Sequence, residues 1–428
     1  RSIRKSFING WNGLLAATIK RGKLWMKVLQ VNTVCGRGST GRIVTDLLFC
    51  LKENGHSGKI AYGLKPMLNA VPSDTILMES RVEYCVHNIL SRFTDNEGGY
   101  SFFGTKRLIS TIEKYRPDVI HLHNLHGHYL NYGMFFSFLK EKNIPLVWTF
   151  HDCWPMTGHC THFVVAGCRQ WKVQCMSCPQ LQCYPCCYTK GNVKENYLKK
   201  KKNFTGLENL VIVTPSQWMA GLVKESFLKE YPVKVIHNGI DLSKFYPRTR
   251  TLFRKKYGLK DETLILGVAS EWGERKGFND FIRLAGELSD NQRLIMVGVN
   301  KKQTKELPKS IITIKKTNSV EELAEIYSAV DVFFNFTYED NFPTVNLEAM
   351  ACGTPVVTYR TGGSPESIAY QTGSVVEQGD YRAALELIDS MMKLDRNVIR
   401  ERTHKRYEAR DRYNEYLELY HSMILSCK

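Results

Sequence analysis

The sequence has no run of about eighteen or more uncharged apolar residues, so it offers no candidate for a membrane-spanning helix. It has no low-complexity tract either, and 43% of its residues are hydrophobic, which indicates a globular rather than a disordered chain. Acidic residues are scarce: 42 Asp and Glu stand against 59 Lys and Arg, a formal net charge of +17. This excess favours an anionic partner such as nucleic acid, an anionic lipid surface or a phosphorylated small molecule, although it also serves solubility.

No signal-peptide pattern is visible, and eight of the 13 cysteines fall between Cys153 and Cys187. This uneven distribution favours a reducing, cytoplasmic setting and a metal site over a disulfide framework. Cys175 and Cys178 form a Cys-x-x-Cys pair, a spacing that suits a structural zinc ion. The expected ligands are Cys160, Cys168, Cys175 and Cys178, and the further candidates are Cys153, Cys183, Cys186, Cys187 and His159. Disulfides and unliganded thiols remain the alternatives.

Residues 1–25 lack an initiating Met and carry two basic clusters around a short apolar stretch. We expect an extension that precedes the first strand. A basic segment that lies on a membrane surface is the alternative.

Beyond this segment, short apolar runs alternate with helical stretches, which predicts an α/β protein with parallel sheets covered by helices on both faces. The expected strands are residues 26–34, 59–64, 117–124, 144–152, 209–216, 233–241, 263–270, 293–299, 311–316, 331–336 and 354–359. Two such series need two cores. We place one domain at 26–237, with a Cys-rich insertion at 153–187, and a second at 238–405. Residues 406–428 are predicted to form a helix that packs back on the first domain.

The stretch EDNFPTVNLEAMACG, residues 339–353, sets carboxylates around a predicted helix start. Pro343 suits a first helical turn, so we expect a helix from Pro343 or Thr344 to Cys352, with Gly353 as its stop. In open α/β sheets, ligands bind outside the carboxyl ends of the strands, where free helix amides attract phosphate or sugar oxygens. Asp340 and Glu348 would either face such a cavity together or only stabilise the helix N-terminus through its dipole.

Together with other motifs, this stretch resembles the donor-site signature of retaining glycosyltransferase family 4. A carboxylate is followed after seven residues by Glu348, then by AMACGTPVV and, at residues 361–366, by TGGSPE. VIHNGIDLSKF (235–245), ERKGF (274–278) and the glycine loop after the first strand match in the expected order. The resemblance covers the chain from about Met26 to the C-terminal helix.

The resemblance implies the GT-B fold, in which two Rossmann-like domains face each other with their parallel sheets across a cleft. It also implies a sugar transfer from a nucleoside diphosphate to an acceptor hydroxyl with retained anomeric configuration. In such enzymes no divalent ion is usually needed for the chemistry, and the leaving phosphate itself is well placed to accept the proton of the acceptor.

The same resemblance assigns roles to the donor residues. Glu348 would hold the ribose hydroxyls, and Asp340 would contact the transferred sugar. The family usually has Glu at the position of Asp340, so the neighbouring Glu339 is an alternative contact. The amides of Thr344 and Val345 would reach sugar or phosphate oxygens.

Two further positions match residues that surround the reacting bond. Lys276 would neutralise the donor diphosphate as the leaving group departs. The Arg that usually stands six residues earlier is Ser270 here, which leaves Arg275 as the second cation. His151 matches a histidine that lines the catalytic cleft near the donor sugar.

The glycine loop CGRGSTGR contains Gly36, Gly38 and Gly41 and resembles the first-domain loop that faces the acceptor and the donor phosphate across the cleft. His121 and His123 alternate on a predicted strand. The resemblance favours cleft-floor and packing roles for them, and a metal pair is the alternative.

The Cys-rich insertion resembles one found in a bacterial subgroup linked to capsule and exopolysaccharide synthesis. This implies a glycan or polyprenyl-diphosphate-linked acceptor, and basic runs such as LKKKK (198–202) could seat the enzyme on the inner face of the cytoplasmic membrane. The closest rival is another GT-B enzyme, an inverting transferase or a sugar-nucleotide epimerase. A zinc-containing nucleic-acid-binding protein would leave the donor signature unexplained, so we expect no nucleic-acid partner.

Overall fold

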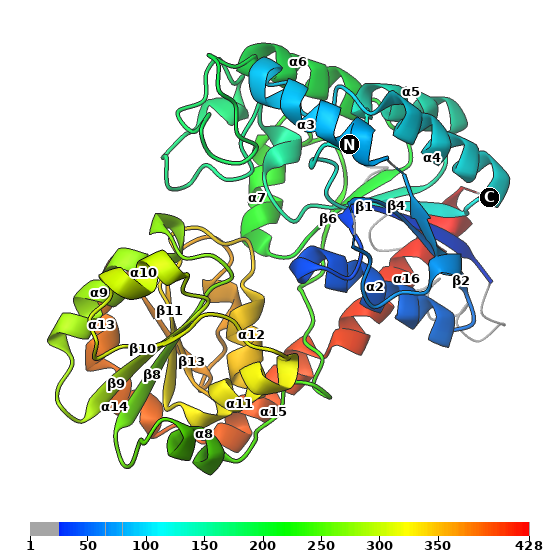
Figure 1. Cartoon of the computed structure of the whole chain (residues 1–428). Coiled ribbons are helices and arrows are strands. Elements are labelled where there is room, and N and C mark those ends of the chain that lie inside the picture. The colour runs from blue at the N-terminus through cyan, green and yellow to red at the C-terminus, as the bar shows by residue number, and fades with distance from the viewer. Residues whose placement is uncertain (1–24, 65, 79, 428) are drawn as a thin grey trace, which may run out of the picture.

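The computed structural model describes residues 25–64, 66–78 and 80–427, so the N-terminal segment before Trp25 lies outside the described residues. The described chain forms two parallel sheets, one of seven and one of six strands, each in its own half of the molecule (Figure 1). Helices cover the sheets, as parallel strands require because both of their faces are apolar. The predicted α/β architecture of two Rossmann-like domains is confirmed.

The first sheet has the strand order β3-β2-β1-β4-β5-β6-β7. Its strands are β1 (Lys27–Val34), β2 (Ser57–Leu64), β3 (Thr75–Leu77), β4 (Val119–Leu122), β5 (Leu146–Thr149), β6 (Leu210–Thr214) and β7 (Val233–Val235). The helices between them are α2 (Gly38–Glu53), α3 (Arg81–Thr94), α4 (Phe102–Tyr115), α5 (Tyr132–Lys142), α6 (Val193–Phe204) and α7 (Gln217–Glu225). Every residue of β4 and β5 is buried, which fits their central place in the sheet.

The second sheet has the order β10-β9-β8-β11-β12-β13. Its strands are β8 (Thr263–Val268), β9 (Gln292–Val297), β10 (Ile312–Ile314), β11 (Val332–Asn335), β12 (Val356–Tyr359) and β13 (Gly373–Val376). The helices that follow β7 are α8 (Arg250–Lys256), α9 (Phe278–Glu287), α10 (Lys301–Glu306), α11 (Val320–Ala329), α12 (Thr344–Ala351), α13 (Tyr381–Glu386), α14 (Ile388–Met392), α15 (Arg396–Tyr407) and α16 (Ala409–Ser426).

Three local predictions differ from the structure. The short edge strands β3 and β13 were not expected; they have only three and four residues, too short a pattern to predict a strand. Helix α2 already begins at Gly38, so Gly38 and Gly41 belong to its first turns and not to the preceding loop. The strand expected at 233–241 ends at Val235, where the chain leaves the first sheet.

Helix α16 returns to the first domain after the chain has completed the second (Figure 1). Its buried side chains, among them Tyr413, Leu417 and Tyr420, pack in one cluster with Val28 of β1 and with Met26, which precedes that strand. No helix among the described residues is both long enough and apolar enough to cross a bilayer.

Candidate active site

The donor loop, residues 336–343, leaves the carboxyl end of β11 and leads into α12. Pro343 is the N-cap of this helix and Cys352 its C-cap, and Gly353 follows with a φ of +79°. The predicted start and stop of the helix are therefore confirmed. As first-turn groups, the amides of Thr344 and Val345 have no acceptor within the helix.

The TGGSPE motif packs directly against the donor loop. A Cβ atom on Gly362 would lie 2.0 Å from the carbonyl oxygen of Asp340, and one on Gly363 would lie 2.0 Å from that of Asn341. The Gly363 amide also donates to the Asp340 carbonyl at 3.0 Å. Glycine is required at both positions because no side chain fits between the two backbones.

Asp340 and Lys276 form an ion pair in which Nζ lies 2.6 Å from Oδ2. Burial alone would raise the pKa of Asp340, but the charge and hydrogen bond of Lys276, with help from Arg275, hold it below its ordinary value. Arg275 itself donates to the backbone carbonyl of Glu339 at 3.1 Å. The structure thus brings Lys276, Arg275 and the donor loop together.

Glu348 lies one helical turn further on and is buried. Its carboxylate accepts a hydrogen bond from the Tyr327 hydroxyl at 3.0 Å, and the Arg42 guanidinium of the first domain approaches to 4.0 Å. Burial raises the pKa of Glu348, although Arg42 and Tyr327 act in the opposite direction. Sequence reasoning missed Arg42 and Tyr327; Arg42 ends the CGRGSTGR stretch, next to Gly41, and could have been singled out there.

Glu339 points away from Lys276. Its side chain has no exposed surface and accepts hydrogen bonds from backbone amides of the Cys-rich insertion. Asp340 is therefore the member of this carboxylate pair that contacts the lysine.

His151 follows β5 and lies against the donor loop, where the Asn341 side-chain amide donates to its carbonyl oxygen at 2.5 Å. Its Nε2 lies 3.0 Å from Nδ1 of His123. The pKa of His151 is lowered to about 4, chiefly by burial; Asp152 opposes this shift and His126 adds to it. The imidazole is therefore neutral at pH 7.

His121 and His123 form a packed network behind His151. The ring nitrogens of His121 bond to the hydroxyls of Tyr420 at 2.6 Å and Thr149 at 2.7 Å. Those of His123 bond to His151 and, at 3.3 Å, to the side chain of Gln30. Since every nitrogen of the pair has a protein partner, the geometry fits the packing role and not a metal pair.

The glycine loop closes on itself. The Gly36 amide donates to the Gly41 carbonyl at 3.0 Å, and a Cβ on Gly36 would lie 1.8 Å from the carbonyl oxygen of Leu68. Gly38, with a φ of +67°, has open space where a side chain would stand. Gly36 therefore serves a tight turn, and Gly38 leaves the backbone at the helix start accessible.

The four proposed zinc ligands lie in the insertion between β5 and α6. Cys160 and Cys175 are buried and Cys168 and Cys178 half-buried, with the thiols of Cys160 and Cys178 in mutual contact. The Gly158 amide donates to the Cys175 sulfur at 3.3 Å, but burial raises the pKa of this thiol to about 11. No three of these four sulfurs, all of them in described residues, lie within 4.8 Å of one another, so the structure does not gather the predicted ligands into a metal site.

Within the described part of the chain, three or more ligand atoms come within 4.8 Å of one another in one group, His87, Glu97 and His128. The His87 nitrogens already bond to the Ser101 hydroxyl and the Gly98 amide. These bonds, and the contact of His128 with Glu97 at 2.6 Å, are those of a hydrogen-bonded network in the protein core.

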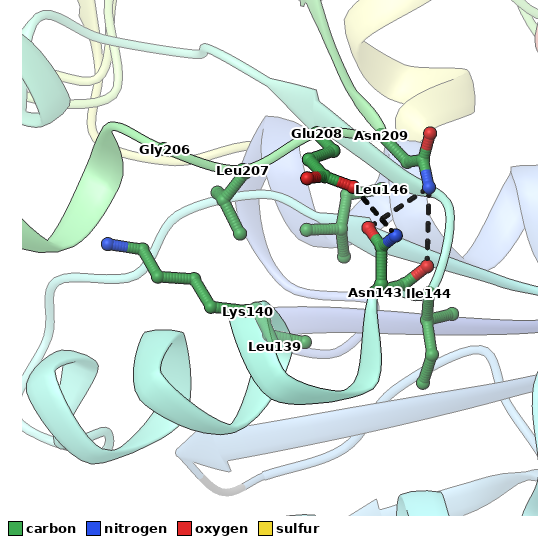
Figure 2. Close-up of a pocket in the computed structure, with 9 residues that line it drawn as sticks. All are labelled: Leu139, Lys140, Asn143, Ile144, Leu146, Gly206, Leu207, Glu208 and Asn209. Atoms are coloured by element: carbon green, nitrogen blue, oxygen red, sulfur yellow. Dashed lines mark hydrogen bonds between the residues drawn. The ribbon is translucent and has the colours of Figure 1, made fainter.

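A small pocket on the first domain lies away from these residues. Figure 2 shows it at the turn between α5 and β5, where Asn143 bonds to Glu208 and Asn209. It borders the amino ends of β5 and β6, whereas His151 follows the carboxyl end of β5. Because parallel strands expose ligand-binding loops at their carboxyl ends, this pocket is not part of the cleft.

Two α/β domains with parallel sheets carry charged side chains at their strand ends, among them Lys276, Asp340 and Glu348. This arrangement defines a GT-B glycosyltransferase. The family models agree: "Glycosyltransferase Family 4" matches residues 40–244, and "Glycosyl transferases group 1" matches residues 249–412. The two matches together span most of the chain, and the chain belongs to this glycosyltransferase family.

Relatives along the whole chain point the same way. Escherichia coli K12 WcaC, whose name places it among glycosyl transferases of colanic acid biosynthesis, is 22% identical over 93% of this chain and 100% of its own. Among solved structures, sucrose-phosphate synthase from Thermosynechococcus elongatus superposes with a TM-score of 0.67 at 17% identity, over 94% of this chain and 100% of that one. Anabaena HepE, solved in complex with UDP-glucose, has a TM-score of 0.63 at 14% identity over 93% and 100%. These superpositions support the GT-B fold.

Proposed function

We propose that this glycosyltransferase moves a sugar from a nucleoside-diphosphate sugar to a glycan or polyprenyl-diphosphate-linked acceptor in bacterial capsule or exopolysaccharide synthesis, with retained anomeric configuration. The observation that carries the proposal is the donor loop, which joins Asp340 and Lys276 of one domain to His151 of the other. The UDP-glucose bound to HepE and the colanic acid assignment of WcaC support the donor and pathway classes.

The proposed chemistry uses the protein's own charges and needs no divalent ion. Lys276 and the first amides of α12 stabilise the charge that builds on the departing diphosphate. Glu348 holds the ribose hydroxyls, and Asp340 orients the transferred sugar. The neutral His151 lines the other wall, where it can accept or donate one hydrogen bond without adding charge.

Retention without a covalent intermediate places the proton of the acceptor hydroxyl on the leaving phosphate. In this scheme the acceptor oxygen attacks the anomeric carbon from the same face as the leaving group, and the new bond forms as the bond to phosphate breaks. A sugar covalently trapped on an Asp or Glu, found by mass spectrometry, would contradict this step.

A panel of nucleotide sugars tests the proposal through the release of nucleoside diphosphate. Adding lipid-linked or free glycan acceptors identifies the second substrate. NMR of the product then separates this proposal from an inverting transferase, through the anomeric configuration. The release assay separates it from an epimerase, which would release no nucleotide.

We further propose that the first domain rests on an anionic membrane surface beside the acceptor. Helix α3 exposes an apolar stripe of Val82, Val86, Ile89 and Phe93, and Phe103 at the start of α4 is 74% exposed. The neighbouring α6 begins beside the end of α3, where Asn192 bonds to the Thr94 carbonyl, and exposes Lys199, Lys201 and Lys202. Exposed apolar and cationic side chains on the same domain fit a lipid surface.

One lysine of the LKKKK run does not take part in this surface. Lys200 is buried, and its ammonium donates to the carbonyls of Trp154 at 2.8 Å and Thr157 at 3.0 Å. The basic run is thus partly a support for the insertion.

A further inference from the structure

The proposed chemistry gives no role to the Cys-rich insertion, yet this segment meets the donor loop at Glu339. The carboxylate oxygens of Glu339 accept hydrogen bonds from three successive backbone amides, those of Phe163 at 2.8 Å, Val164 at 3.0 Å and Val165 at 3.2 Å. His162 adds its Nδ1 at 3.7 Å. The carboxylate belongs to the second domain and all its partners belong to the first.

Three successive amides that converge on one carboxylate form a backbone anion site. Hydrogen bonds to an ionised acceptor are roughly twice as strong as those between neutral groups. A carboxylate with no exposed surface also needs such donors, because its burial without them would be costly. Glu339 therefore fixes the insertion and the donor loop against each other.

The turn that offers these amides is itself closed by the cysteine-rich segment. The Gly167 amide donates to the Val164 carbonyl at 2.9 Å, and the Cys168 amide donates to the Phe163 carbonyl at 3.2 Å. The Phe163 ring stacks on Trp171 with ring centres 4.8 Å apart. Contacts within the insertion thus hold these amides in place independently of Glu339.

The donor loop is tied to the first domain on both sides of Asp340. Glu339 bonds to the insertion and Asn341 bonds to the His151 carbonyl, while Asp340 between them pairs with Lys276 of its own domain. The position of the Asp340 carboxylate is consequently set by contacts from both domains.

We propose that residues 160–168 act as a clasp that positions Asp340 for sugar transfer by holding Glu339, which makes Glu339 a positioning residue and gives the insertion a role in catalysis. The proposal rests on the proposed function, because Asp340 must be the sugar contact for its position to matter. The contact between Glu339 and the insertion, however, can be detected by hydrogen exchange without any turnover.

The first variant, Glu339→Gln, keeps the size of the side chain but replaces one acceptor oxygen with a donor. We expect kcat to fall about tenfold or more, because the Asp340 carboxylate would then lie out of position for the bound sugar most of the time. The KM for the donor should change by less than about threefold, because Glu348 and Lys276 are untouched. Hydrogen exchange at the amides of residues 163–165 should become faster.

The second variant acts from the other side of the clasp. Val165 is the second residue of the turn closed by Gly167, a position at which proline is favoured, so Val165→Pro should keep the turn and remove one amide donor. Val165→Ala keeps that amide and is the matched control. Glu83→Gln is a second control, since Glu83 accepts the amides of Phe103 and Gly104 far from the cleft.

The proposal is supported if Glu339→Gln and Val165→Pro both lower kcat while both controls keep it, with the exchange change confined to the insertion. Wild-type exchange and wild-type kcat in Glu339→Gln would overturn it, as would equal losses in Val165→Ala and Val165→Pro. If the wild type turns over no nucleotide sugar, the proposed function fails, and the exchange data still report whether the clasp exists.

Discussion

The Arg42 guanidinium of the first domain lies 4.0 Å from the Glu348 carboxylate of the second, across the cleft. Arg42 lowers the pKa of Glu348 against the effect of burial. We expect Arg42→Met to raise that pKa, so that donor binding is lost at a higher pH than in the wild type. Calorimetric titration with the nucleoside diphosphate between pH 5 and 8 measures this. Glu348→Gln should bind the diphosphate about tenfold more weakly at every pH in this range, because glutamine does not ionise at any of these pH values.

Lys276 and Asp340 should affect catalysis by different routes. Lys276→Met removes the charge that we propose stabilises the leaving diphosphate, and we expect kcat to fall by about 10²- to 10³-fold. Asp340→Asn keeps the size of the side chain and should lower kcat less, with a marked loss of discrimination among donor sugars. Steady-state kinetics with two nucleotide sugars measure both effects. Unchanged kinetics in both variants would remove these residues from the site.

Acid should destabilise the first domain through its buried histidines. Burial lowers the pKa values of His121 and His123 well below the ordinary value of 6.5 and that of His151 to about 4. Below pH 6.5 the unfolded chain binds protons that the native protein excludes, so the free energy of unfolding falls as the pH drops from 6.5 towards 4. Each histidine contributes up to about 1.4 kcal/mol per pH unit.

Urea denaturation at pH 7 and pH 5 tests this dependence. His123→Gln should reduce the difference between the two pH values, whereas His404→Gln, at an exposed site, should leave it unchanged. An equal pH dependence in wild type and His123→Gln would contradict the assignment.

From its sequence, the insertion is predicted to bind about one zinc ion per chain through Cys160, Cys168, Cys175 and Cys178, which requires these sulfurs to come closer together than they do in the structure. Elemental analysis of protein purified without a chelator measures the content. Cys175→Ser should lower it strongly, whereas Cys427→Ser, at an exposed cysteine outside the insertion, should not. A content under about 0.2 zinc per chain in the wild type would rule out the site. If the prediction holds, chelation should also speed hydrogen exchange at residues 163–165.

The apolar stripe of α3 is predicted to bind anionic vesicles. Ile89→Glu and Phe103→Glu place charges on this surface and should reduce co-sedimentation with phosphatidylglycerol vesicles by about tenfold or more at low salt. Leu252→Glu, at a side chain that is 68% exposed on the second domain, is the matched control. Equal binding by all three variants would place the membrane contact elsewhere.

Much of the fold was predictable because its determinants are local. Apolar runs between helical stretches reveal the central strands, and Pro343 and Gly353 mark the ends of α12. The proposed donor residues Asp340 and Glu348 follow from one motif, since they lie on one loop and the helix that it leads into. Edge strands such as β3 give a much weaker signal, because three residues are too few to show a strand pattern.

The contacts between the domains could not be read from the sequence. The partners of Glu339 are backbone amides, which every residue except proline possesses, so no residue type identifies them. Arg42 and Glu348 meet only because two separate domains close on each other. The buried position of Lys200 likewise depends on the path of the insertion, whereas its sequence context indicates a solvated basic run.

The return of α16 to the first domain makes the chain cross between the domains twice, and the two crossings lie side by side. The Ile240 amide donates to the Tyr407 carbonyl at 2.8 Å, and the Ala409 amide donates to the Ile240 carbonyl at 3.1 Å. A Cβ on Gly239 would lie 2.5 Å from the Cα of Ala409. Two paired crossings restrict the relative motion of the domains more than one linker would, so we expect any opening of the cleft to be a rotation about this pair.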